Sequence, residues 1–214
     1  MKKTFFIFLV TLPWIGMAQH KWELGVNLGI NSSDVVYANR LKDWSFENNA
    51  TTTRCGALVK YHWNGRWAIR LEFNKEIRGW NWKRDILNSS GQTISTFTDY
   101  RYDFWTLPVV VDFAMDKQRR FYSSIGLTTM LQKEGTKIIR ATGERDGREL
   151  YEPSSGNGIY QFAGLANIGY AYPIYGNLYF YGETRFNLSF NYFEPRRKGY
   201  HYAYSAIMGI TYRL

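Results

Sequence analysis

The chain has 214 residues, enough for one domain, and 18% of them are aromatic although the mean hydropathy is negative, a combination that an ordinary soluble domain does not show. Cys55 is the single cysteine, which excludes an intrachain disulfide, and no stretch after Gln19 approaches 18 consecutive apolar residues, which excludes an α-helical membrane protein. The formal charge of +9 would suit nucleic-acid binding, but the export signal described next argues against nucleic acid as a partner.

The first predicted element is an N-terminal export signal. Lys2 and Lys3 precede an apolar stretch over residues 5–16, and residues 16–18 have the small-x-small spacing that signal peptidase reads. We expect residues 1–18, or 1–19, to be the signal peptide, and residues 19–214 to form the mature outer-membrane domain. The apolar stretch is too short for an uncleaved membrane anchor, which needs roughly 20 residues.

Eight strands are predicted from alternating apolar and polar residues. Residues 22–31 alternate strictly, with apolar side chains from Trp22 to Ile30 on one face and polar side chains or glycine on the other. Each predicted strand is near or above the roughly 9–11 residues that a tilted strand needs to cross a bilayer. The other seven are 52–63, 67–80, 100–114, 121–132, 158–172, 178–192 and 202–213.

The predicted connections alternate between short and long. Residues 64–66 begin with the hairpin signal Asn64-Gly65, and 115–120 and 173–177 are also short. The long connections are 32–51, 81–99, 133–157 and 193–201. Asp146-Gly147 in the third of them predicts a hairpin that extends its two strands beyond the membrane. This pattern predicts an all-β fold, an eight-stranded antiparallel up-and-down transmembrane β-barrel of a bacterial outer membrane, with long outer loops, short periplasmic turns and both termini in the periplasm.

Charged strand residues are expected to face the barrel lumen, because a charge facing the middle of the bilayer costs roughly 2–4 kcal/mol. An eight-stranded barrel has room for side chains and little else, so nearly balanced charges predict a filled lumen, with a narrow pore as the alternative. Glu72 and Glu76 resemble a catalytic carboxylate pair, but the flanking Arg70 and Arg78 favour ion pairs. The predicted lumen charge network is Arg54, Lys60, Arg70, Glu72, Glu76, Arg78, Arg101, Asp103, Asp112, Glu183 and Arg185, with Glu23 and Arg213 also inward.

Aromatic residues near the strand ends predict two interfacial girdles. Lys75 faces lipid by parity, and we expect it to snorkel to the outer headgroups. Much of the surplus positive charge lies in turns and in the last loop, where lipid phosphates or anionic glycans would attract it. The predicted girdle residues are Trp22, Trp63, Trp67 and Tyr212 on the periplasmic side, and Trp80, Trp82, Tyr192 and Tyr202 on the outer side.

Few residues suggest catalysis or metal binding. The three histidines do not cluster, so we predict no metal site, no cofactor and no enzymatic activity. His201 and Ser205 share a parity near the outer rim, but four residues along a strand span about 13 Å, too far for direct contact. A partner on the adjacent strand, such as Ser189, leaves an acyl-chain hydrolase or transferase as an alternative; otherwise His201 is a rim histidine at the headgroup level.

Two segments resemble the PorT-like outer-membrane β-barrel family. Residues 104–112 (Phe-Trp-Thr-Leu-Pro-Val-Val-Val-Asp) resemble its Tyr-Leu-Glu-Ile-Pro-Leu-Leu-Leu-Lys strand, and residues 183–188 resemble its Glu-x-Arg-Tyr strand. The resemblance implies a small barrel from a family of diverse or unknown roles, one member of which belongs to a protein-secretion apparatus. We expect a non-enzymatic barrel acting through its loops in binding, envelope integrity or complex assembly, with outer-membrane lipid and an envelope protein as partners. A secretion-apparatus subunit is the alternative.

Overall fold

The computed structural model describes residues 21–37, 49–87, 93–142, 150–153, 160–191 and 199–214. All regular structure in these residues is β-strand. The described residues contain no helix that is long and apolar enough to cross a membrane. The strands are β1 (Trp22–Tyr37), β2 (Ala50–His62), β3 (Trp67–Leu87), β4 (Thr93–Ala114), β5 (Phe121–Thr142), β6 (Leu150–Pro153), β7 (Tyr160–Tyr175), β8 (Leu178–Ser189) and β9 (Gly199–Arg213).

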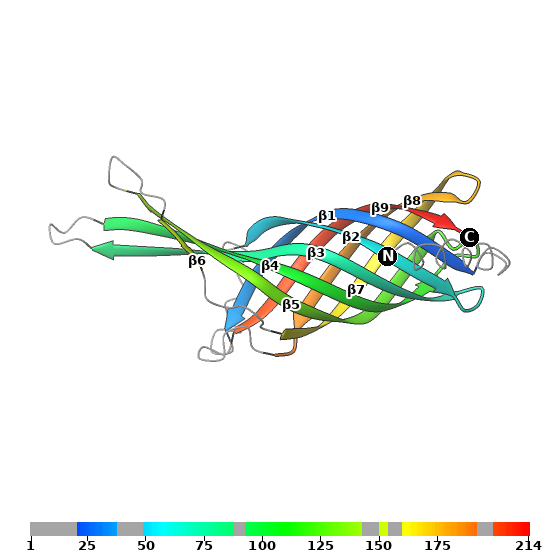
Figure 1. The fold of residues 1–214 in the computed structure, drawn as a ribbon, viewed down its shortest axis with the longest axis horizontal. Coiled ribbons are helices and arrows are strands. Elements are labelled where there is room, and N and C mark those ends of the chain that lie inside the picture. The colour runs from blue at the N-terminus through cyan, green and yellow to red at the C-terminus, as the bar shows by residue number, and fades with distance from the viewer. Residues whose placement is uncertain (1–20, 38–48, 88–92, 143–149, 154–159, 192–198) are drawn as a thin grey trace, which may run out of the picture.

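Eight of these strands form a closed antiparallel barrel (Figure 1). Neighbours in the chain pair around the barrel, β1 pairs with β9, and β4 pairs with both β3 and β5, so that every barrel strand has two partners. Burial alternates along the strands in the middle of the barrel, as in β7, where side chains of odd number from Gln161 to Ala171 lie inside. The prediction of an eight-stranded antiparallel barrel is confirmed.

Three strands, β1, β3 and β4, run further than the sequence predicted, and β1 continues past its predicted end at residue 31 to Tyr37. Residues 81–87 and 93–99, expected to lie in a loop, instead continue the β3–β4 ladder from Asn81↔Asp99 to Leu87↔Thr93. The β4–β5 ladder continues to Ser95↔Thr142. β-Branched residues are frequent in these extensions, and their backbones pair as readily as those of the barrel.

β6 completes a four-stranded sheet outside the barrel by pairing with residues 136–139 of β5. We call residues 81–87, 93–99 and 136–142, together with β6, the projecting sheet. It stands away from the barrel at the left of Figure 1. Asp146 and Gly147, the expected hairpin tip, lie outside the described residues, although the strands on either side of them are paired.

The opposite end of the barrel, called here the turn end, carries the short connections and both ends of the described chain (Figure 1). The Asn64 side chain accepts hydrogen bonds from the backbone N–H groups of Arg66 and Trp67, both at 2.9 Å. Gly176 adopts a φ of +53°, a left-handed conformation that glycine favours, in the turn between β7 and β8. The end bearing the projecting sheet is called the loop end.

Candidate functional site

The outer surface of the barrel is apolar. Large side chains that face away from the lumen are strongly exposed, including Val26 at 61%, Leu127 at 63% and Ile125 at 71%. In β8 and the residue after it, the outward positions from Phe180 to Phe190 are apolar, Gly or Thr, whereas Glu183 and its inward neighbours are buried. An apolar belt around a closed barrel is suited to hydrocarbon.

Two features limit the height of this apolar belt. At the turn end four predicted girdle residues lie on the outer surface, namely Trp22, Trp63, Trp67 and Tyr212. Toward the loop end Lys75 faces outward and forms an ion pair of 3.3 Å with Asp103. Eight residues separate Trp67 from Lys75, or about 26 Å along a strand and about 20 Å along the barrel axis at a tilt near 40°. This height is close to the apolar band of about 25 Å in outer-membrane barrels.

The predicted outer girdle is partly wrong. Trp80 and Tyr202 are buried, with exposures of 6% and 2%. Trp80 shares the inward parity of Arg78 in β3, and the hydroxyl of Tyr202 donates a hydrogen bond to the Asn49 side chain at 3.1 Å. The Trp82 side chain and the whole of Tyr192 lie outside what the structure describes.

Glu72 is the centre of the lumen charge network. Its carboxylate accepts hydrogen bonds from the Arg185 guanidinium at 2.6 and 2.9 Å and forms ion pairs with Arg54 and Arg70, each at 3.3 Å. Glu183 bridges two of the same cations, because it lies 2.7 Å from Arg70 and 2.6 Å from Arg185. These five side chains come from β2, β3 and β8 and are almost completely buried, so the network spans the lumen from wall to wall.

The network continues toward both ends of the barrel. Toward the loop end Glu76 lies 2.7 Å from Arg78 and 3.9 Å from Arg54. Toward the turn end Asp112 lies 3.0 Å from Lys60 and 3.2 Å from Arg70. Each carboxylate of the lumen network therefore has at least one cation beside it, which offsets the cost of removing its charge from water.

Arg101 and Asp103 were predicted to belong to this network, and that prediction is wrong. In β4 the even-numbered residues from Tyr102 to Asp112 are buried, so odd-numbered residues face outward. Arg101 pairs on the outside with Asp99 at 3.0 Å, and Asp103 pairs with Lys75. Without Arg101 and Asp103 the lumen has one cation and one anion fewer than predicted, so its positive and negative charges remain nearly balanced. Within the described residues the lumen-facing cations are Arg54, Lys60, Arg70, Arg78, Arg185 and Arg213, and the anions are Glu23, Glu72, Glu76, Asp112 and Glu183.

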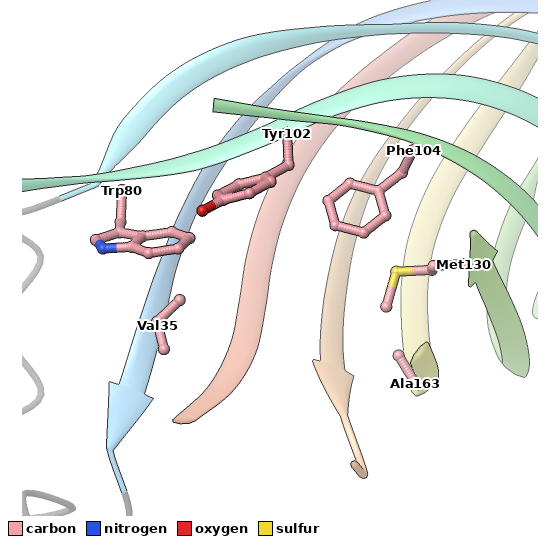
Figure 2. Packing of buried hydrophobic residues seen from close by; sticks show 6 residues of the cluster. All are labelled: Val35, Trp80, Tyr102, Phe104, Met130 and Ala163. Atoms are coloured by element: carbon pink, nitrogen blue, oxygen red, sulfur yellow. The ribbon is translucent and has the colours of Figure 1, made fainter. Parts of the chain in front are cut away.

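An apolar cluster lies above the charges at the loop end (Figure 2). Trp80 stacks on Tyr100 and Tyr102, with ring centroids 4.7 and 5.4 Å away, and Phe104 and Met130 are fully buried. The sequence signal for this cluster was the inward parity that Trp80 shares with Arg78. We call the cluster the loop-end plug; its members are Val35, Trp80, Tyr102, Phe104, Met130 and Ala163.

A family model described as an outer membrane protein beta-barrel domain matches residues 17–193, most of the chain. The chain belongs to this family. It is therefore an outer-membrane barrel, as its apolar belt also indicates. The PorT-like assignment is finer than this match and stays a prediction.

Several solved outer-membrane proteins are similar to the barrel. Neisserial surface protein A shares 11% identity over 89% of this chain and 97% of its own, with a TM-score of 0.45. Ail, the attachment invasion locus protein of Yersinia pestis, was solved in complex with the heparin analogue sucrose octasulfate. It shares 12% identity over 91% of this chain and 99% of its own, with a TM-score of 0.40. OprG of Pseudomonas aeruginosa shares 13% identity over 91% of this chain and 96% of its own, with a TM-score of 0.39. No curated protein matches the chain.

The histidines of the outer-membrane barrel lie apart from one another. His201 was expected at the rim, but its side chain is fully buried inside the barrel, with its ring centroid 5.5 Å from Trp80 and 6.0 Å from Phe104. Ser189 accepts a hydrogen bond from the backbone N–H of His201 at 2.7 Å. His62 contacts Glu23 at 2.9 Å near the turn end, and His20 lies outside the described residues. In the described part of the barrel no three His, Cys, Asp or Glu side chains form a group that could hold a metal.

The projecting sheet of the outer-membrane barrel has an open edge. The β2–β3 ladder ends at Arg54↔Glu76, and one further bridge joins Asn49 to Trp80. Beyond it, residues 82–87 of β3 pair with β4 on one side, and no described strand pairs with their other side. An unpaired strand edge offers a row of backbone donors and acceptors to an incoming strand.

Proposed function

We propose that this protein is a non-enzymatic, non-conducting outer-membrane barrel that holds the projecting sheet outside the cell, where a partner protein adds a strand to the open edge of β3. The observation that carries the proposal is the open edge at residues 82–87, about 20 Å long at about 3.3 Å per residue. Extended peptides bind such edges through backbone hydrogen bonds. In bacterial barrels the turns face the periplasm, and this orientation directs the projecting sheet outward.

The filled lumen supports the absence of conduction. The charge network crosses the lumen at Glu72, and the loop-end plug packs above it. An ion entering from the loop end would meet apolar and aromatic side chains and then paired charges. In a barrel of this size the side chains occupy the interior.

The burial of His201 supports the absence of acyl-chain chemistry. A general base has to reach its nucleophile and a substrate, and the His201 ring has no exposed surface. The Ser189 hydroxyl also contacts the backbone of His201. An acyl-transfer activity in purified protein that His201→Ala abolishes would overturn this part of the proposal.

The partner hypothesis is tested by photo-crosslinking in native outer membranes. A photoreactive residue at Asp85, in the open edge, is expected to crosslink a partner protein, whereas the same residue at Lys117, in a turn at the other end, is not. Replacing residues 84–96 with a two-residue Asn-Gly turn removes the hairpin tip while leaving the barrel ladders intact, and is expected to abolish co-purification of that partner. Retention of the partner by the shortened variant would contradict the proposal, as would steady conductance of the intact protein in planar bilayers.

A second candidate is a subunit of a protein-secretion apparatus, which the PorT-like resemblance of residues 104–112 and 183–188 favours. Both candidates use a protein partner, but they differ in where it binds. Crosslinks from Lys117 to other envelope proteins, with none from Asp85, would favour the secretion subunit.

A further inference from the structure

The turn end of the lumen opens into a small depression, called here the turn-end mouth. It has a volume of about 30 Å³, and the cations around it are Lys60, Arg66, Arg119 and Arg213. Such a volume is about that of one water molecule, so a larger ligand would sit at the opening and not inside.

Two of the four cations around the mouth, Lys60 and Arg213, are already paired. Lys60 contacts Asp112 at 3.0 Å, and Arg213 contacts Glu23 at 3.1 Å. Among the described residues, no carboxylate forms an ion pair with Arg66 or Arg119. The surplus positive charge of the mouth therefore resides on these two guanidinium groups.

Two neighbouring turns place the two arginines around the same mouth. Arg66 belongs to the turn between β2 and β3, and Arg119 belongs to the turn between β4 and β5. The Nη2 atom of Arg119 reaches across, 3.8 Å from where a Cβ on Gly65 would stand. The backbone oxygen of Arg66 accepts a hydrogen bond from the N–H of Ala114 at 2.8 Å, which ties the first turn to the end of β4.

Arg119 holds this place in an unfavourable backbone conformation. Its φ is +57°, and among the described residues it is the one non-glycine residue with a positive φ. Arginine is a costly choice there, since glycine and asparagine adopt the left-handed region more easily. Strain of this kind at a side chain that lines a depression points to a role for that side chain.

We propose that Arg66 and Arg119 clamp a phosphate group at the turn-end mouth, at the depth of the lipid headgroups. Guanidinium groups bind phosphate oxygens through paired N–H donors. Trp63 and Trp67, which flank Arg66 in the sequence, are 66% and 42% exposed, and exposed tryptophan side chains gather at the membrane–water interface. The phosphate therefore belongs to a phospholipid of the adjoining leaflet or to a free phosphate compound in the periplasm.

Native mass spectrometry of the full chain in detergent tests the proposal with two probes, phosphatidylglycerol and inorganic phosphate, which are titrated separately. The control lipid is diacylglycerol with the same acyl chains, which lacks the phosphate. The double variant Arg66→Gln/Arg119→Asn removes both charges and keeps a residue that tolerates the φ of position 119. Lys117→Gln, in the same turn but outside the mouth, is the matched control.

The wild type and Lys117→Gln are expected to retain phosphatidylglycerol at least about tenfold better than the double variant, since two charge-assisted hydrogen-bonding groups are lost. Binding of inorganic phosphate that depends on both arginines, without a preference among the lipids, would assign the same clamp to a free phosphate compound. Equal retention of both probes by the wild type and the double variant would overturn the proposal, as would equal losses in Lys117→Gln and the double variant. Arg119→Gly adds a readout that a structural role would not give: it is expected to raise the urea midpoint of unfolding while weakening binding.

Discussion

Replacing Glu72 with glutamine removes the central charge of the lumen network with little change in volume. Arg185, Arg54 and Arg70 lose a carboxylate at 2.6, 3.3 and 3.3 Å. Removing one partner of a buried ion pair costs about 3–5 kcal/mol, because the other charge stays buried. Each arginine keeps another carboxylate, as Arg185 keeps Glu183 at 2.6 Å, so we expect the lower value, about 3 kcal/mol.

The measurement is urea unfolding of the refolded barrel in phospholipid vesicles, followed by tryptophan fluorescence, with the free energy of unfolding obtained by linear extrapolation. The control is the same chemical change at an exposed site. Asp103→Asn removes the partner of Lys75, and these two side chains are 37% and 50% exposed. Solvent screens such pairs, so this variant is expected to lose less than about 1 kcal/mol.

Equal losses for Glu72→Gln and Asp103→Asn would refute the reasoning. They would mean that water solvates the lumen charges as well as it solvates the surface pair. The lumen would then be a hydrated channel, and the proposal of a non-conducting barrel would fail with it.

Three other substitutions test the fold and the turns. Leu127→Arg places a charge in the outer apolar belt, where Leu127 is 63% exposed, and is expected to cost about 2–4 kcal/mol in the same unfolding assay. Trp80→Ala empties part of the loop-end plug and is expected to cost about 3–5 kcal/mol, with planar-bilayer recording to detect any conductance. In the β4–β5 turn slight burial tends to raise the pKa of Asp116, but the N–H groups of Phe121 and Arg120 donate to its carboxylate and hold the pKa below its usual value. The Asp116 carboxylate therefore contributes its full share to the free energy of unfolding above the usual aspartate pKa of about 4, and this contribution is lost as the pH falls through the lowered value. Asp116→Asn is expected to remove this acid dependence from unfolding curves recorded at several pH values.

The barrel strands were predictable because lipid on one side and packed side chains on the other impose a strict alternation. Residues 22–30 show it without interruption. The β3–β4 part of the projecting sheet was not predictable in the same way, whereas Asp146-Gly147 had predicted a hairpin between its β5 and β6 parts. Residues 93–99, Thr-Ile-Ser-Thr-Phe-Thr-Asp, are rich in strand-forming residues but lack a consistently apolar face, since no hydrocarbon surrounds them. Their strand structure depends on backbone pairing with neighbours that the barrel has already aligned.

The sequence could indicate which charges face the lumen, but not which of them pair. Arg185 and Glu72 lie 113 residues apart in the chain and meet across the lumen. Alternation gives the face of each residue, whereas its height relative to other strands depends on the stagger of the whole barrel. The partners of Glu72 therefore follow from closure of the sheet and not from any local pattern.

Arg101 and Trp80 show which of two sequence rules takes precedence. The charge rule placed Arg101 inside, and the aromatic rule placed Trp80 at the outer interface, yet the alternation in β4 and β3 puts each on the opposite face. Alternation follows from backbone geometry along the whole of a regular strand, whereas a charge is excluded from the outer face only within the hydrocarbon. Arg101 lies past the Lys75–Asp103 pair, where that exclusion has ended, and so it faces water. By the same geometry Trp80 continues the inward face of β3. It therefore joins the loop-end plug, which lies between the lumen charge network and the solvent at the loop end.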